Sequence, residues 1–163
     1  MISIGIDPLL VTLGTFSISW HSLFIVIGVM VAVWFSARLV AKAGLSADML
    51  YSMLAWAIPG GIIGARLVHV VDYWGYYSSN PGAIPAFWMG GVAIWGAILG
   101  GVITAIIFAR VKGVSLPLYG DLAAFGILLA QAIGRIGDII NGEHISTPTG
   151  LPWGVVYTHL SSP

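Results

Sequence analysis

The densest group of side chains that could do chemistry lies within residues 134–144, in an otherwise apolar part of the sequence. On an α-helix, whose period is about 3.6 residues, Arg135 and Asp138 share one face. Asn141 and Glu143 lie on the flanks of that face. The planar guanidinium of Arg135 suits a phosphate group, and the two carboxylates could orient it or move protons. The pattern predicts either a polar pocket for a phosphate-bearing ligand or a salt-bridged helix end without a function.

A second polar group, Arg66, His69 and Asp72, has the three-residue spacing that places neighbours on one helix face. It could be a functional cluster, or an ordinary helix end whose arginine extends toward water. The chain has no cysteine, and none of its four histidines is spaced like a metal ligand. We therefore expect no metal and no cofactor, and any thiol chemistry must use the sulfur of a partner.

The composition shows what kind of element must position these residues. Hydrophobic residues make up 58% of the 163 and charged residues 7%, whereas a soluble domain carries roughly 25% charge. This excludes an ordinary soluble domain and a disordered chain. Six basic residues balance six acidic ones, so the net charge is zero and we expect no nucleic-acid partner.

Long stretches without charge predict membrane spans. The thirty residues between Asp7 and Arg38 contain no Asp, Glu, Lys or Arg, and about 20 apolar residues cross a bilayer as a helix. No basic segment precedes this stretch, so we expect a span that stays in the mature protein rather than a secretory signal. The fold class is predicted to be all-α, a polytopic integral membrane helical bundle in one domain, 1–163. Its four spans lie near 18–37, 49–71, 90–109 and 116–137.

The connection at 73–89 is rich in Tyr and Trp, which favours a segment lying at the lipid headgroups. Basic residues predict the orientation, because loops rich in Lys and Arg stay in the cytoplasm. Arg38 and Lys42 follow the first span, and Arg110 and Lys112 follow the third. The N-terminus and the 73–89 segment are then expected outside.

Small residues at four-residue spacing indicate where helices approach one another. Gly60 and Gly64 form one such pair, and Gly96 and Gly100 form another. We expect these glycines to serve helix packing and assign them no catalytic role.

The polar run also carries a resemblance to a known family. Residues 134–143, with 151–157 downstream, resemble the signature G-R-x-G-N-F-x-N-x-E of the bacterial prolipoprotein diacylglyceryl transferases. Residues 18–23, 60–66 and 90–96 resemble the other characteristic blocks of that family, in the same order. The resemblance covers nearly the whole chain, and its first motif is specific.

The resemblance implies transfer of a diacylglyceryl group from phosphatidylglycerol to the lipobox cysteine of a preprolipoprotein, with release of glycerol phosphate. Phosphatidylglycerol, the lipobox peptide and membrane lipid would be the partners, at the outer face of the bacterial cytoplasmic (inner) membrane. Arg135 matches the family arginine and would contact the lipid phosphate. Asn141 and Glu143 also match, and Glu143 would position Arg135 or a substrate hydroxyl. Arg66 is a second cation that could face the same cavity.

Three positions depart from the family pattern. Asp138 replaces the usual Asn, which adds a negative charge beside the phosphate site unless Arg135 neutralises it; we expect Asp138→Asn to be tolerated. Trp95 replaces a His or Tyr, so it cannot act as a base. His21 replaces the usual Tyr, and it could be the base near neutral pH or a packed, hydrogen-bonded histidine. The catalytic candidates are thus His21, Asp138 and Glu143.

Members of this family continue well beyond the position where this sequence stops, with further spans and a second arginine. We therefore expect the chain to be part of a longer protein that alone could be inactive. Two other functions stay open: a membrane protein that binds or moves an anionic lipid without breaking it, and a scaffold subunit whose polar residues only align helices.

Overall fold

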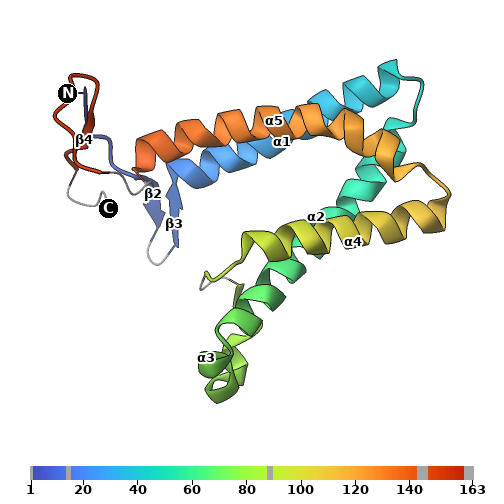
Figure 1. Ribbon diagram of the computed structural model, residues 1–163, viewed down its shortest axis with the longest axis horizontal. Coiled ribbons are helices and arrows are strands. Elements are labelled where there is room, and N and C mark those ends of the chain that lie inside the picture. Colours follow the sequence, from blue (N-terminus) through green and yellow to red (C-terminus); the bar gives the residue numbers. More distant parts are fainter. Residues whose placement is uncertain (1, 14–15, 88–89, 143–146, 160–163) are drawn as a thin grey trace. The chain divides into compact units, whose positions relative to one another are not determined.

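The computed structural model describes residues 2–13, 16–87, 90–142 and 147–159. In chain order its elements are β1 (Ile2–Ile4), β2 (Leu9–Leu13), β3 (Phe16–Ser19), α1 (Trp20–Lys42), α2 (Ala47–Asp72), α3 (Trp74–Ser79), the 3-10 turn η1 (Pro81–Ala83), α4 (Ile94–Lys112), α5 (Leu116–Asn141) and β4 (Val155–Tyr157) (Figure 1).

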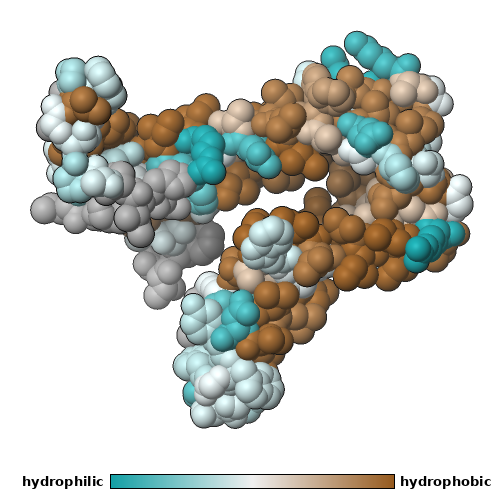
Figure 2. Space-filling model, viewed as in Figure 1, coloured by the Kyte–Doolittle hydropathy of each residue, from teal (hydrophilic) through white to brown (hydrophobic). Residues whose placement is uncertain are grey.

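Within the described residues, four helices are long and apolar enough to cross a membrane: α1, α2, α4 and α5. Most of their large apolar side chains are exposed on the surface of the protein. In a bilayer these side chains would contact lipid instead of water. Figure 2 shows apolar residues along the sides of these helices and polar residues mainly at their ends. The predicted fold class, an all-α polytopic membrane protein, is confirmed. The four short strands form two two-stranded sheets that the sequence pattern did not predict.

The chain divides into two compact units. The first comprises Met1–Arg38 and Leu122–Pro163. Within it α1 and α5 lie side by side (Figure 1). Their backbones approach closely because small residues face each other: a side chain at Gly28 would meet the backbone of Ala130, and one at Gly126 would meet that of Ala32.

Strands at one end of the first unit tie the chain's early and late segments together. Strand β1 pairs in parallel with β4, so that Ile2 lies opposite Val155 and Ile4 opposite Tyr157. Strands β2 and β3 form an antiparallel pair that leads directly into α1. The start of α1 and the residues after α5 therefore share one end of this unit.

The second unit is Leu39–Asp121, in which α2 packs against α4. The predicted glycine pairs form the contact: Gly64 faces the backbone of Gly96 and Gly100, and Gly60 faces Thr104 and Gly100. The hydroxyl of Thr104 donates to the carbonyl of Gly100 in its own helix. Glycine is required at Gly64, Gly96 and Gly100 because a Cβ at any of them would overlap the facing backbone.

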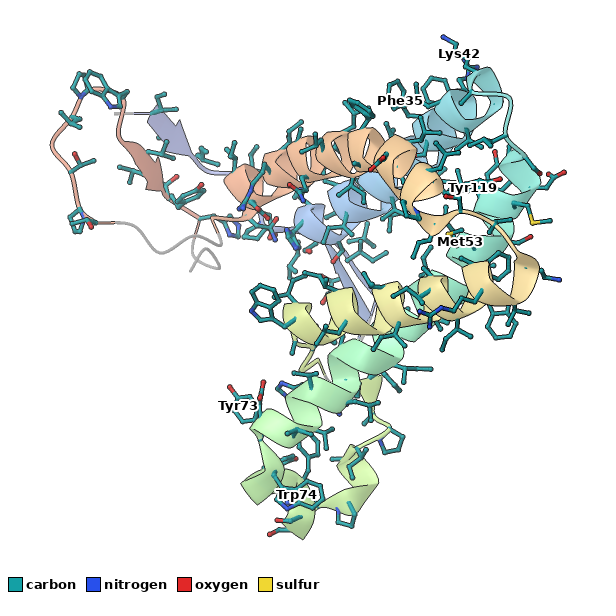
Figure 3. All side chains as sticks on the ribbon, turned by 45° about the vertical axis from the view of Figure 1, so that its right-hand side comes forward. Phe35, Lys42, Met53, Tyr73, Trp74 and Tyr119 are labelled. Carbon is teal, nitrogen blue, oxygen red and sulfur yellow. The ribbon has the colours of Figure 1, made fainter. Side chains whose placement is uncertain are left out.

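The segment between α2 and α4 holds α3 and η1, and Figure 3 shows Tyr73 and Trp74 at this end of the unit. Helix α4 begins at Ile94 rather than near residue 90. The reason is backbone conformation, because Gly90 and Gly91 have φ of 78° and 80°, outside the helical region. The placement of 73–89 at the lipid headgroups stays a prediction.

Candidate functional site

The start of α1 meets the end of α5 in the first unit. Gly137 makes this possible, since a Cβ at that position would lie 2.9 Å from the Cα of His21. At this close approach the backbone N–H of His21 donates to Oδ1 of Asn141 over 3.3 Å. Asn141 is only 4% exposed. It satisfies an N–H in the first turn of α1, which lacks a partner within its own helix.

Asp138 connects two residues of this end through its two carboxylate oxygens. Oδ1 lies 2.6 Å from Nδ1 of His21, and Oδ2 accepts a hydrogen bond of 3.0 Å from Nη1 of Arg135. The Asp138 side chain is 12% exposed, that of His21 30% and that of Arg135 66%. The carboxylate is thus largely buried, between an imidazole and the guanidinium of a side chain that is two-thirds exposed.

These contacts bear on two expectations from the sequence, the shared helix face and the charge at position 138. Arg135 and Asp138 do share a helix face, and Arg135 neutralises the extra negative charge at position 138. The sequence did not predict that His21 would join them, because it lies in another helix. Glu143, another predicted site residue, lies outside the described residues.

A tyrosine that sequence reasoning left without a role holds the end of α5. The hydroxyl of Tyr157 donates to the carbonyl of Ile139 over 2.7 Å. Its ring covers Gly142, whose φ of 71° ends the helix and whose missing Cβ leaves room for that ring. Tyr157 belongs to residues 151–157, the downstream block of the resemblance, and this was the one indication in the sequence that it contributes to the site. It orients the last turn of α5, where Asp138 and Asn141 lie.

Arg66 occupies a different setting, in the second unit. Arg66 as a whole residue is 3% exposed. Among the described residues, its guanidinium donates to backbone carbonyls. Nε donates to Ile84 over 2.8 Å and Nη2 to Ala83 over 2.6 Å. Nη1 donates to Gly90 over 2.6 Å and to Gly91 over 2.9 Å. Four of the five N–H donors of a guanidinium are thus used to hold the two arms of one segment together.

A polar cavity of about 280 Å³ lies beside this guanidinium, lined by Arg66, His69, Tyr76, Tyr77, Ala83, Gly90 and Gly91. The ring centres of Tyr77 and Phe87 lie 5.2 and 5.8 Å, respectively, from Cζ of Arg66. A Cβ at Gly91 would overlap His69 and lie 3.0 Å from Nη1 of Arg66. The predicted contact of Arg66 with a lipid phosphate stays a prediction.

No three His, Cys, Asp or Glu side chains come together as a metal site within the ranges that the structure describes. Trp95, in the first turn of α4, is largely exposed. Its indole has no basic nitrogen and can only donate a hydrogen bond. Among the described residues that the sequence analysis singled out as catalytic, His21 and Asp138 are therefore the ones in mutual contact.

Comparison with known proteins shows the family to which the chain belongs. A profile of the family named prolipoprotein diacylglyceryl transferase matches residues 8–162. The chain belongs to this family. It is 42% identical over 148 residues to the phosphatidylglycerol–prolipoprotein diacylglyceryl transferase of Lysinibacillus sphaericus, covering 91% of this chain and 54% of the relative. Its counterpart from Trichormus variabilis is 40% identical over 146 residues, covering 90% and 52%. That from Bacillus velezensis is 41% identical over 138 residues, covering 85% and 51%.

The chain thus spans about half the length of the curated relatives that it matches. In this member of the prolipoprotein diacylglyceryl transferase family, residues 134–141 of the run that resembles the family signature form the last turns of α5. The block around His21, residues 18–23, comprises the end of β3 and the first turn of α1. Two blocks that are far apart in the sequence therefore come together at one end of the first unit.

Proposed function

We propose that the full-length protein transfers a diacylglyceryl group from phosphatidylglycerol to the lipobox cysteine of a preprolipoprotein. The cysteine sulfur attacks the glycerol carbon that carries the phosphate ester and forms a C–S bond. The C–O bond to phosphate breaks, and its electron pair leaves with glycerol phosphate. The thiol proton must be removed, because the thiolate is the nucleophile. No redox partner is required.

The observation that carries this proposal is the Arg135 guanidinium in a chain of this family. One nitrogen is held by Asp138, while two thirds of the side chain is exposed at the end of a helix long enough to span a membrane. A guanidinium fixed in this way can donate two parallel hydrogen bonds to phosphate oxygens. It would also stabilise the negative charge that develops on the leaving group.

The other predicted site residues take supporting roles in this proposal. Asn141 would hold α1 at the site and could contact the lipid headgroup. Glu143 would orient Arg135 or a substrate hydroxyl. Arg66 would add a second positive charge through its remaining donor. His21 and Asp138 are the candidates for proton transfer.

We also propose that the site faces outward from the bacterial cytoplasmic (inner) membrane. Helix α1 has 23 residues, a length of about 35 Å at about 1.5 Å per residue. His21 stands at its start, whereas Arg38 and Lys42 stand in its last turns. Because basic ends favour the cytoplasm, the opposite end with the cluster would lie at the outer surface.

The test uses membranes that contain the full-length protein, phosphatidylglycerol labelled in its headgroup glycerol, and a lipobox peptide. We expect labelled glycerol phosphate to appear in a one-to-one ratio with thioether-linked peptide. Arg135→Lys should lose most of this activity, because an ammonium cannot make two parallel hydrogen bonds. Arg110→Lys is the matched control, since Arg110 lies exposed in the last turn of α4.

Redistribution of lipid without release of glycerol phosphate would refute the transferase and favour a protein that binds or moves lipid. Wild-type turnover in Arg135→Lys would place the phosphate contact elsewhere.

A further inference from the structure

Two of the departures from the family pattern lie in contact. His21 stands where the resemblance has Tyr, and Asp138 stands where it has Asn. Their side chains come from α1 and α5, yet Nδ1 of His21 lies 2.6 Å from Oδ1 of Asp138. Changing both positions thus places an imidazole and a carboxylate together, which neither replacement alone would achieve.

We propose that His21 is the general base for the substrate thiol in this protein and that Asp138 is its positioning residue. This inference rests on the proposed transferase function. The imidazole would take the thiol proton as the C–S bond forms and the C–O bond to phosphate breaks. It would then pass that proton to the departing glycerol phosphate. The substrates supply all atoms and electrons, and His21 ends the cycle as it began.

The carboxylate has a physical reason to be required. Removing a proton from the thiol makes His21 positively charged, and a carboxylate 2.6 Å away stabilises that charge. The side chain of Asp138 is only 12% exposed, so water screens this interaction little. Its contact with Nδ1 would also direct Nε2, the other ring nitrogen, toward the reacting thiol.

The same carboxylate holds Arg135, which links the proposed base to the proposed phosphate contact. Oδ1 faces His21 and Oδ2 accepts from Arg135, so both oxygens are used. An asparagine at position 138 has one acceptor oxygen and one NH2 group. If its NH2 faced the guanidinium, two donors would meet and that contact would be lost. If it faced the imidazole, it would donate to Nδ1 and leave the ring proton on Nε2, the nitrogen that has to accept the thiol proton. The sequence alone favoured a tolerated Asp138→Asn, whereas these contacts lead us to expect the opposite.

The alternative is an ion pair that only fastens α1 to α5, and a selenocysteine lipobox peptide distinguishes the two. A selenol is ionised at neutral pH, so its attack needs no base. A positioning role therefore predicts a defect confined to the cysteine peptide, while a purely structural role predicts equal loss with both peptides.

The experiment measures kcat and KM of the full-length protein in membranes for three variants. These are His21→Gln, Asp138→Asn and the double variant His21→Tyr with Asp138→Asn, which restores both family residues. With the cysteine peptide we expect each single change to lower kcat by on the order of 100-fold or more, as for loss of a general base. The KM for phosphatidylglycerol should change less than kcat. With the selenocysteine peptide most of the lost kcat should return.

The double variant should be no slower than Asp138→Asn alone, because residues that act as one unit are not additive. The matched control is a second histidine–aspartate contact, in which Nε2 of His159 lies 3.8 Å from Oδ2 of Asp7. His159→Gln and Asp7→Asn should keep wild-type kcat.

Each contrary result is decisive. The inference would be overturned by near-wild-type kcat in Asp138→Asn, or by equal losses of kcat with both peptides. The proposed function would still stand in that case, provided that the wild-type protein releases glycerol phosphate. If Asp138→Asn does not fold, His21→Gln decides with the same two peptides, since it leaves the carboxylate in place. A wild-type protein that releases no glycerol phosphate would overturn the proposed function and this inference together.

Discussion

Replacing Arg66 with lysine should destabilise the second unit strongly. Arg66 donates to the carbonyls of Ala83 and Ile84 on one side and to those of Gly90 and Gly91 on the other. A guanidinium reaches both sides because its nitrogens point in different directions, whereas an ammonium donates from a single atom. At least two of the four hydrogen bonds should be lost. With bonds to charged groups contributing about 1.5–3 kcal/mol each, the free energy of unfolding should fall by about 3–6 kcal/mol.

The measurement is unfolding of the full-length protein in mixed micelles by titration with sodium dodecyl sulfate, followed by tryptophan fluorescence. Limited proteolysis within residues 80–93 gives a second readout, because the segment should be cut faster once its fastening is removed. The control is Arg110→Lys, an arginine that is exposed in the last turn of α4. It should change neither the unfolding transition nor the proteolysis rate.

Unchanged stability in Arg66→Lys would refute this reasoning. If the variant also had a raised KM for phosphatidylglycerol, the main role of Arg66 would be to bind the lipid, as the sequence suggested. A large loss of stability with an unaltered KM in the folded fraction would instead show that the main role of Arg66 is to stabilise the segment between α2 and α4.

Four further substitutions test packing and single hydrogen bonds, with the same unfolding titration as the measurement. Gly64→Ala should lower the free energy of unfolding by about 1–3 kcal/mol, because the new methyl group would overlap a carbonyl oxygen of the facing helix. Gly134→Ala should instead leave it unchanged or raise it by up to about 1 kcal/mol, since no atom of another described element lies within 4 Å of the new Cβ. Tyr157→Phe should cost about 0.5–1.5 kcal/mol by removing the donor to the Ile139 carbonyl; an equal stability would show that this bond is replaced by water. Tyr119→Phe should cost a similar amount, because its hydroxyl donates to the carbonyl of the residue that caps the start of α2.

Several features of this protein could be predicted from its sequence, because they depend on residues close together in the chain. The spans follow from the length of the uncharged stretches, and four helices of suitable length are present. The packing of α2 against α4 follows from glycines at four-residue spacing. The contact between Arg135 and Asp138 follows from the period of one helix.

The tertiary structure decided which polar groups meet across the chain. The partners of Arg66 are backbone carbonyls, which every residue possesses, so no residue type in the sequence could reveal them. His21 meets Asp138 and Asn141 only because α1 and α5 pack side by side through small residues. Helix periodicity relates positions within one helix and carries no information on which helix lies beside it. The spacing of residues thus determined which side chains share a face, and packing decided which faces came together.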